Sequence, residues 1–377
     1  MSPIPLAFYA PLKPPTHPNP SGDRTLAQLL MQALALAGFE VMLASRFRSR
    51  DGSGNPHRQQ RLRRLGERLA QRLIRRLDAL PAEHRPRLWL TYHLYHKAPD
   101  WLGPTVCRTL GIPYVVVEAS YAPKQQTGPW RLGLEASLGA LHQADAVLCF
   151  NPVDRACLAE RLPPRRLHAL PPFLDLAPPP SPHPSRAQLA ERWGIDPRPP
   201  WLIAVAMMRP GDKAHSYRLL AEALKLLPGD LPWQLLIAGD GRAAAQVRAD
   251  FAALEDRVRF LGLQPPEALQ PLLAAADLCV WPAVNEAFGM ALLEAQAQGT
   301  AVLAGDEGGV KTVLAPECQG WLTPPRDPVA FAAALARLLA SPEELARLGK
   351  KAQAYVETHH GLPATAGRLQ ALLTPLL

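Results

Sequence analysis

The chain has 377 residues, of which 48% are hydrophobic and 20% charged, and its formal net charge is +8. This length and composition predict a globular protein with enough core for two domains. No apolar run reaches the roughly 18 residues that a membrane-spanning helix needs, which excludes an integral helical membrane protein.

The N-terminal residues and the cysteines indicate where the protein works. Residues 1–9 lack the basic start and long apolar core of a signal peptide, and they predict a first strand instead. The five cysteines are odd in number and scattered, and none has metal-ligand spacing: Cys107, Cys149, Cys157, Cys279 and Cys318. We therefore expect reduced, mostly buried cysteines in a cytoplasmic protein.

The positive charge is concentrated in the first half of the chain. Residues 1–175 contain 23 lysines and arginines against 13 acidic residues, a net charge of +10, whereas the remainder has a net charge of −2. A basic half favours an anionic partner, which could be nucleic acid, an acidic lipid surface or a phosphorylated substrate. The alternative is that these arginines only decorate solvated faces.

The chain opens with a strand, a loop, a helix and a second strand. Strands are predicted at Ile4–Tyr9 and Glu40–Ser45, with a proline-rich loop (residues 11–22) and a helix at Thr25–Ala37 between them. In open α/β sheets ligands bind beside such a loop, which makes Gly22 a candidate for the approach of a ligand phosphate or an acceptor. Either Ser21 or Asp23 is expected to cap the helix.

An arginine-rich helix is predicted over residues 56–80. Leucines recur at spacings of three and four along one face: Leu62, Leu65, Leu69, Leu73, Leu77 and Leu80. Eight arginines between residues 58 and 76 occupy the other faces. The pattern fits an amphipathic helix packed on a sheet with its arginines in water. It also fits a basic surface that rests on an anionic membrane, where each basic residue contributes about 1 kcal/mol.

Three further strands alternate with helical segments, at Arg87–Thr91, Tyr114–Glu118 and Ala146–Phe150, which predicts a parallel sheet. Polar and aromatic residues follow two of them, in the segments 92–97 and 118–124. A doubly wound sheet presents its ligand crevice at such strand ends, which makes His93 in the first segment and Tyr121 and Lys124 in the second candidate functional residues. A lone histidine can equally be structural.

Nine prolines between residues 163 and 184 predict an extended, semi-rigid segment. We place a domain boundary near residue 175, after a short strand at Leu167–Leu170. The predicted N-terminal domain is therefore 1–175 and the C-terminal domain 176–355, followed by a final segment, 356–377.

A second alternating α/β pattern follows the prolines. Strands are predicted at Trp201–Met207, Gln234–Ala238, Val258–Leu261, Leu278–Trp281 and Ala301–Ala304. Helices are predicted at Ser216–Leu227, Arg242–Ala253, Pro266–Ala276, Gly289–Gln298, Pro328–Ala340 and Pro342–His359. The chain is therefore expected to form two Rossmann-like domains.

The fourth of these strands leads into the most informative segment of the chain. Glu286 lies in the strand-to-helix loop, Glu294 lies inside the following helix, and Gly289 lies between them. The first turn of a helix has unpaired N–H groups and a positive dipole end, which attract an anion. A carboxylate beside an anion site predicts a ligand that carries both phosphates and hydroxyl groups.

Other strand ends of this half carry residues suited to the same ligand. Arg209 and Lys213, four residues apart on a predicted loop, can neutralise a diphosphate without a metal. Tight glycine turns follow at Gly239-Asp240-Gly241 and Gly308-Gly309. No cluster in the sequence predicts a bound metal.

Taken together, these motifs resemble those of the retaining nucleotide-sugar glycosyltransferases of family 4 (group 1), which have the GT-B fold. The segment from Glu286 to Glu294 is similar to the Glu-x7-Glu motif of that family, and the resemblance covers nearly all of the second domain. It implies an α/β fold of two Rossmann-like domains that face each other across a cleft. It also implies that the final segment, 356–377, crosses back to the first domain.

The resemblance also implies roles for individual residues. Glu286 would bind hydroxyls of the donor sugar, Glu294 would bind the ribose, and Arg209 and Lys213 would stabilise the leaving diphosphate. His93 would face the reacting centre, and Tyr121 and Lys124 would contact the donor phosphate or the acceptor. The remaining residues implied in donor binding are the N–H groups of Phe288, Gly289, Met290 and Ala291, the turn at Gly239, and a base-binding loop at Gly262, Leu263 and Gln264.

The sequence therefore predicts a metal-independent, retaining glycosyltransferase without a cofactor, whose donor is a UDP- or GDP-linked sugar. Its acceptor would be a glycan or lipid-linked molecule of envelope or polysaccharide assembly, with an anionic membrane surface as a further partner at the inner membrane face. The alternatives are a sugar-nucleotide epimerase, a phosphorylase, or a non-catalytic nucleotide-sugar-binding protein. Nucleic-acid binding is not expected, because the arginine-rich helix lacks interleaved aromatic residues.

Overall fold

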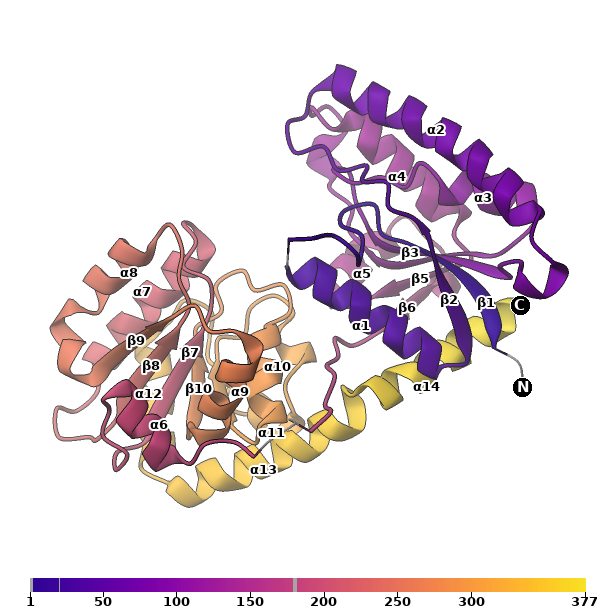
Figure 1. Ribbon diagram of the computed structural model, residues 1–377. Coiled ribbons are helices and arrows are strands. Elements are labelled where there is room, and N and C mark those ends of the chain that lie inside the picture. The colour runs from indigo at the N-terminus through magenta and orange to yellow at the C-terminus, as the bar shows by residue number, and fades with distance from the viewer. Residues whose placement is uncertain (1–2, 20, 179–181) are drawn as a thin grey trace. The chain divides into compact units, whose positions relative to one another are not determined.

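A computed structural model describes residues 3–19, 21–178 and 182–377 (Figure 1). The contacts divide the chain into two compact units, Met1–Pro171 with Leu362–Leu377, and Pro172–Gly361. The predicted proline linker lies partly outside the described residues, at 179–181, as does Pro20 of the first loop.

The N-terminal unit is built on a six-stranded parallel sheet with the order β2-β1-β3-β4-β5-β6. Its strands are β1 (Ile4–Tyr9), β2 (Phe39–Ser45), β3 (Leu88–Leu94), β4 (Tyr114–Ala119), β5 (Ala146–Cys149) and β6 (Leu167–Ala169). The central strands are buried almost throughout, because helices cover both faces of the sheet. β3 extends beyond the predicted end at Thr91, so His93 lies within a strand and not in the loop after it.

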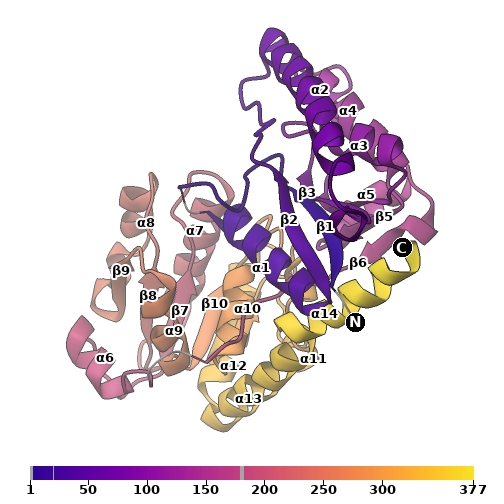
Figure 2. The same cartoon turned by 45° about the vertical axis from the view of Figure 1, so that its right-hand side comes forward.

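The helices of this unit form two layers. Its helices are α1 (Gly22–Leu36), α2 (Pro56–Asp78), α3 (Gly103–Leu110), α4 (Arg131–Gln143), α5 (Pro152–Ala159) and α14 (Leu362–Leu373). On one face α2 packs with α3 and α4. On the other, α14 lies along α1 in both views (Figures 1 and 2), so the last helix of the chain completes the first unit.

The face that α2 buries contains most of the predicted leucine stripe. Its buried residues are Gln59, Gly66, Ala70, Leu73, Ile74 and Leu77, and Leu69 and Leu80 also pack against the core. A Cβ at Gly66 would lie 2.3 Å from the Cβ of Trp101, so a small residue is needed where α2 meets the segment before α3. The exception in the stripe is Leu65, which is 39% exposed.

The C-terminal unit contains a five-stranded parallel sheet with the order β11-β10-β7-β8-β9. Its strands are β7 (Trp201–Val205), β8 (Gln234–Ala238), β9 (Val258–Gly262), β10 (Leu278–Trp281) and β11 (Ala301–Ala304). Its helices are α6 (Arg186–Trp193), α7 (Asp212–Lys225), α8 (Ala244–Asp250), α9 (Pro266–Ala275), α10 (Met290–Ala297), α11 (Pro316–Gln319), α12 (Pro328–Leu339) and α13 (Pro342–His359). The sequence analysis did not predict α6, whose start is marked by a Ser185–Gln188 capping box.

Both units therefore have the Rossmann-like α/β architecture that the sequence predicted. All five cysteines are free, and four of them are buried. No helix within the described ranges is long and apolar enough to cross a bilayer.

Candidate functional site

The strand order of the C-terminal sheet places two loops side by side. The chain starts this sheet at β7, adds β8 and β9 on one side, and then returns to add β10 and β11 on the other. The loops that follow β7 and β10 therefore leave neighbouring strands in opposite directions. In open α/β sheets ligands bind at such a switch point.

Three contacts tie the loop after β10 to the start of α7. The Lys213 ammonium group forms an ion pair with the Glu286 carboxylate. The side-chain amide of Asn285 donates to Oδ2 of Asp212 at 3.0 Å. The N–H of Val284 donates to Oγ of Ser216, also at 3.0 Å. Two residues predicted to serve the same ligand are thus brought into direct contact.

Lys213 was predicted on a loop, but it lies in the first turn of α7, which begins at Asp212. Arg209 precedes that helix, and its carbonyl accepts from the N–H of Ala214 at 3.1 Å. The Arg209 side chain is exposed to solvent. Both cations therefore lie at the N-terminus of a 14-residue helix, whose positive dipole end adds to their attraction for an anion.

The Glu286 carboxylate is partly buried and has two side-chain partners, Lys213 and Trp281. Its side chain is 14% exposed, and its Oε2 also accepts from the indole N–H of Trp281 at 3.0 Å. The Lys213 ammonium lies 5.3 Å from the centre of the same Trp281 ring. These contacts hold the carboxylate at one place at the end of β10.

The loop that carries Glu286 has an unusual backbone. Ala283 and Asn285 have φ values of 60° and 48°, in the left-handed region that residues with a side chain rarely adopt. Each such residue costs on the order of 1 kcal/mol or more and persists only where surrounding contacts hold it. Such strain is common at binding and catalytic sites.

The glycine turn after β11, at Gly308 and Gly309, packs against the backbone of the loop that carries Glu286. The N–H of Gly309 donates to the Glu286 carbonyl at 2.9 Å. A Cβ on Gly308, which has a φ of 65°, would lie 1.9 Å from that oxygen. The turn was predicted to approach a ligand, but here it packs against the backbone of the Glu286 loop.

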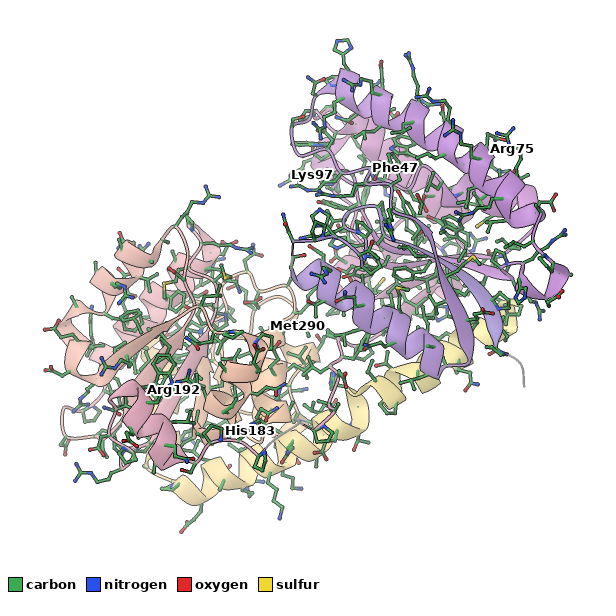
Figure 3. All side chains as sticks on the ribbon, viewed as in Figure 1. Phe47, Arg75, Lys97, His183, Arg192 and Met290 are labelled. Atoms are coloured by element: carbon green, nitrogen blue, oxygen red, sulfur yellow. The ribbon has the colours of Figure 1, made fainter. Side chains whose placement is uncertain are left out.

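Glu294 lies one turn into α10, which begins at Met290 and has Gly289 as its N-cap (Figure 3). No side chain caps this helix, so the first-turn N–H groups, which include those of Met290 and Ala291, are not satisfied by a cap. Burial raises the pKa of the Glu294 carboxyl to about 7. Phe288 is partly buried in the preceding loop.

Two other predicted donor-binding segments also meet. The N–H of Gly239, after β8, donates to the carbonyl of Gly262, the last residue of β9, at 2.8 Å. Leu263 follows Gly262 and is 66% exposed, which leaves an apolar side chain at the end of β9. The side chain of Gln264 donates to the carbonyl of Leu261.

The N-terminal sheet has its own switch point, between β1 and β3. There Nδ1 of His93 lies 3.0 Å from Oδ1 of Asp23, in the first turn of α1. Ser21 is the N-cap of that helix, so Asp23 is not needed as a cap. Both residues were candidates from the sequence, but no local pattern connects them, because they are 70 positions apart in the chain.

Other acidic groups lie within electrostatic range of His93. Glu118, on β4, is buried, and burial raises the pKa of its carboxyl to about 7. Burial also raises the pKa of Asp154 on α5. His93 lowers the pKa of Asp23, chiefly through their hydrogen bond.

The other predicted residues of the N-terminal unit lie elsewhere. Gly22 begins α1, and a Cβ there would meet no atom within 4 Å. Tyr121 is buried, and its hydroxyl accepts from the side-chain amide of Gln126 at 2.8 Å. Lys124 is exposed and acts electrostatically on His96. Among the described residues, no group of three or more His, Cys, Asp or Glu side chains could hold a metal ion.

Comparison with known proteins extends these observations. Residues 186–355 match the family model described as "Glycosyl transferases group 1". The D-inositol 3-phosphate glycosyltransferase of Thermobispora bispora is 36% identical over 203 residues, which are 51% of this chain and 47% of that protein. The chain thus spans about half or less of the length of the first curated relatives it matches.

Two solved structures share the fold over nearly the whole chain. Sucrose-phosphate synthase from Thermosynechococcus elongatus superposes with a TM-score of 0.68 at 23% identity, over 99% of each chain. Anabaena HepE in complex with UDP-glucose superposes with a TM-score of 0.69 at 17% identity, over 98% of this chain and 99% of that one. The predicted fold class is confirmed by these likenesses.

Proposed function

We propose that the protein transfers a sugar from a nucleotide diphosphate donor to an acceptor, with retention of configuration, on the basis that residues 186–355 match the family model of the group 1 glycosyl transferases. The observation that carries the proposal is the contact between Lys213 and Glu286 at the switch point of the C-terminal sheet. The Lys213 ammonium group suits the diphosphate of a sugar nucleotide, and the Glu286 carboxylate suits the hydroxyl groups of its sugar. The names of the relatives and the UDP-glucose complex of HepE agree with such a donor.

In this proposal the donor separates the Lys213–Glu286 pair. The diphosphate takes Lys213 and Arg209, while the sugar hydroxyls donate to the Glu286 carboxylate. As the glycosidic bond breaks, negative charge grows on the leaving diphosphate, and the two cations and the α7 and α10 N-termini stabilise it. The two cations make the proposed reaction independent of a metal, and we propose no cofactor.

The nucleoside would lie along the ends of β8, β9 and α10. Glu294 would accept hydrogen bonds from the ribose, because a carboxylate can accept from two hydroxyls at once. The base would lie against the loop at residues 262–264, where the exposed Leu263 offers apolar contact. The N-terminal unit, with His93, would bind the acceptor, which we propose to be a glycan or lipid-linked molecule.

Nucleotide binding tests the donor site directly. At a ligand concentration of about 100 times Kd, binding stabilises the native state by about 2.7 kcal/mol, which corresponds to a shift of roughly 5–10 °C for a domain of this size. We expect either UDP or GDP to give such a shift in a thermal-unfolding panel, with ADP and inorganic phosphate as controls, and we expect it to persist in EDTA. The absence of a shift with every nucleotide and nucleotide sugar would reject the donor site.

An epimerase on the same fold would bind the same donor. It would change the configuration of the sugar with no acceptor present, whereas a transferase leaves the sugar configuration of the unused donor unchanged. A non-catalytic binding protein would bind the nucleotide sugar but would not cleave it, so no free nucleotide diphosphate would form. Analysis of the donor after incubation with and without candidate acceptors separates the three functions.

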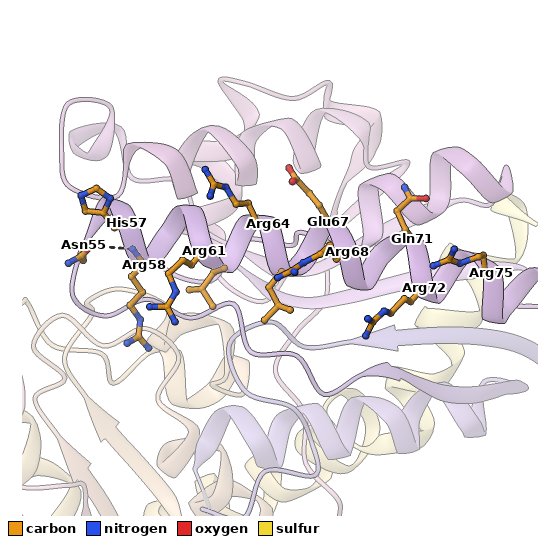
Figure 4. A pocket seen from close by; sticks show the side chains of 12 residues that line it. Asn55, His57, Arg58, Arg61, Arg64, Glu67, Arg68, Gln71, Arg72 and Arg75 are labelled. Carbon is orange, nitrogen blue, oxygen red and sulfur yellow. Dashed lines mark hydrogen bonds between the residues drawn. The ribbon is translucent and has the colours of Figure 1, made fainter.

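We further propose that the protein rests on an anionic membrane surface through α2. Six arginines of this helix, with Leu62 and Leu65 between them, line an open surface hollow of about 1420 Å³ whose lining residues all lie between Asn55 and Arg75 (Figure 4): Arg58, Arg61, Arg64, Arg68, Arg72 and Arg75. Exposed arginines with apolar residues between them suit the interface of a bilayer. A role in envelope or polysaccharide assembly at the inner membrane face would follow.

Liposome co-sedimentation tests this surface. Since each basic residue near an anionic bilayer contributes about 1 kcal/mol, the variant R64Q/R68Q should bind vesicles containing acidic lipid roughly tenfold to thirtyfold more weakly. The variant K350Q/K351Q removes two exposed charges from α13 and should bind as the wild type does. Equal binding of the wild type to neutral and acidic vesicles would contradict the proposal.

A further inference from the structure

The switch point of the N-terminal sheet holds a histidine whose orientation is set by an aspartate. Nδ1 of His93 lies 3.0 Å from Oδ1 of Asp23, and the two residues are 70 positions apart in the chain. Asp23 is 39% exposed and His93 25% exposed in their side chains, so solvent or a ligand can reach the pair.

The charge of Asp23 decides which ring nitrogen carries the proton. The hydrogen bond from His93 lowers the pKa of the Asp23 carboxyl, which is therefore ionised at neutral pH. A carboxylate only accepts hydrogen bonds, so Nδ1 must be the donor. In the neutral ring, Nε2 then carries a lone pair and no hydrogen, and it is the nitrogen left to meet another molecule.

Two neighbouring strands, β3 and β4, each contain one residue with a left-handed backbone conformation close to the imidazole of His93. β3 pairs with β4 in the register Tyr92 with Val117 and Leu94 with Ala119, so His93 and Glu118 occupy equivalent positions. Both have left-handed φ values, 62° and 63°. Two adjacent strands thus leave regular geometry at the same level, where the sheet ends and where ligands of this fold class bind.

Other charged and titratable groups face the same place from each neighbouring element. Glu118 lies on β4 and Asp154 on α5, and His93 acts electrostatically on both carboxyl groups. The rings of Tyr92 and Tyr95 lie 5.8 and 5.2 Å from the imidazole ring. Lys13, in the loop after β1, acts on Asp23. The imidazole is therefore held by a hydrogen bond on one side and by packed rings on others.

We propose that Asp23 is a positioning residue of the transfer reaction, which holds His93 with Nδ1 protonated and directs Nε2 toward a substrate hydroxyl. The inference rests on the proposed function, in which the N-terminal unit binds the acceptor. Asp23 itself touches no substrate in this scheme, and it acts through the tautomer and orientation of the ring.

The variant D23N keeps the size of the side chain but removes the charge that selects the tautomer. We expect kcat to fall about tenfold to hundredfold, with KM for the nucleotide sugar within twofold and an altered pH profile of kcat. D23E should recover part of the loss, and D23N should have no further effect in the variant H93Q, because both changes remove the same interaction. Thermal unfolding checks that the variants fold.

A readout without activity keeps this inference separate from the proposed function. In ¹⁵N imidazole NMR of the wild-type protein, His93 should show a protonated Nδ1 that changes in D23N. A wild-type His93 with only Nε2 protonated would overturn the inference, as would wild-type kcat and an unchanged pH profile in D23N. A wild-type protein that releases no nucleotide diphosphate from any nucleotide sugar would reject the proposed function, and Asp23's role in transfer with it, while the NMR result would still decide the tautomer.

Discussion

Replacing Glu286 with alanine is expected to lower sugar transfer by about 10²–10³-fold, while the affinity for the free nucleotide diphosphate stays equal or increases. In the free protein the Glu286 carboxylate pairs with Lys213 and accepts from Trp281. Without it, Lys213 is available to the diphosphate with no ion pair to break, but the sugar loses its carboxylate. Steady-state kinetics with the nucleotide sugar and titration with the nucleotide alone measure the two effects.

The variant should lose a modest amount of stability, about 1–2 kcal/mol, because a partly buried ammonium and an indole N–H lose their partner. Glu344→Ala is a matched control, since it removes a carboxylate from an exposed ion pair with Arg347 on α13. That control should keep wild-type kinetics. Folded Glu286→Ala with unchanged transfer would show that this carboxylate does not bind the donor sugar.

Replacing Glu294 with glutamine should weaken nucleotide binding about tenfold to hundredfold and remove its dependence on pH near neutrality. Burial raises the pKa of Glu294 to about 7, so the carboxyl is mostly protonated at pH 6 and mostly ionised at pH 8. The ionised form accepts two ribose hydroxyls, so wild-type affinity should rise between these values and binding should release protons. Calorimetry in buffers of different ionisation enthalpy measures both.

The Glu294 carboxyl should also make folding stability depend on pH, with stability falling as pH rises whereas nucleotide affinity increases. Its pKa is higher in the folded than in the unfolded chain, so the folded state binds more protons between about pH 4.5 and 7, and stability falls as pH rises through this window. Glu294→Gln removes this loss, whose upper limit is on the order of 3 kcal/mol for a pKa raised from 4.5 to about 7, and should therefore be more stable than the wild type at pH 8.

Glu118 provides the control for this experiment, because burial raises its pKa to about 7 as well but it lies in the N-terminal unit. Glu118→Gln should change the pH dependence of stability in the same direction and leave nucleotide affinity unaltered. If Glu294→Gln bound the nucleotide within twofold of the wild type with the same pH dependence, the ribose would not lie at Glu294.

The local pattern of the sequence predicted most elements of the fold. Every strand from Ile4 to Ala304 lies where apolar runs between turn residues predicted it, because a buried parallel strand requires a continuous apolar segment. The failures have physical reasons. In α2, Leu65 of the leucine stripe is exposed beside the close contact at Gly66, and α7 begins before Lys213 because bonds from the β10–α10 loop hold its first turn.

The sequence by itself determined the two-domain α/β architecture and the candidate residues at strand ends, because hydrophobic periodicity and turn residues act over a few positions. Only the tertiary structure decided which candidates meet. Lys213 pairs with Glu286 across 73 positions and Asp23 with His93 across 70, each at the switch point of its own sheet. Such pairs depend on strand order, which brings loops distant in the chain together, and no local pattern records that order.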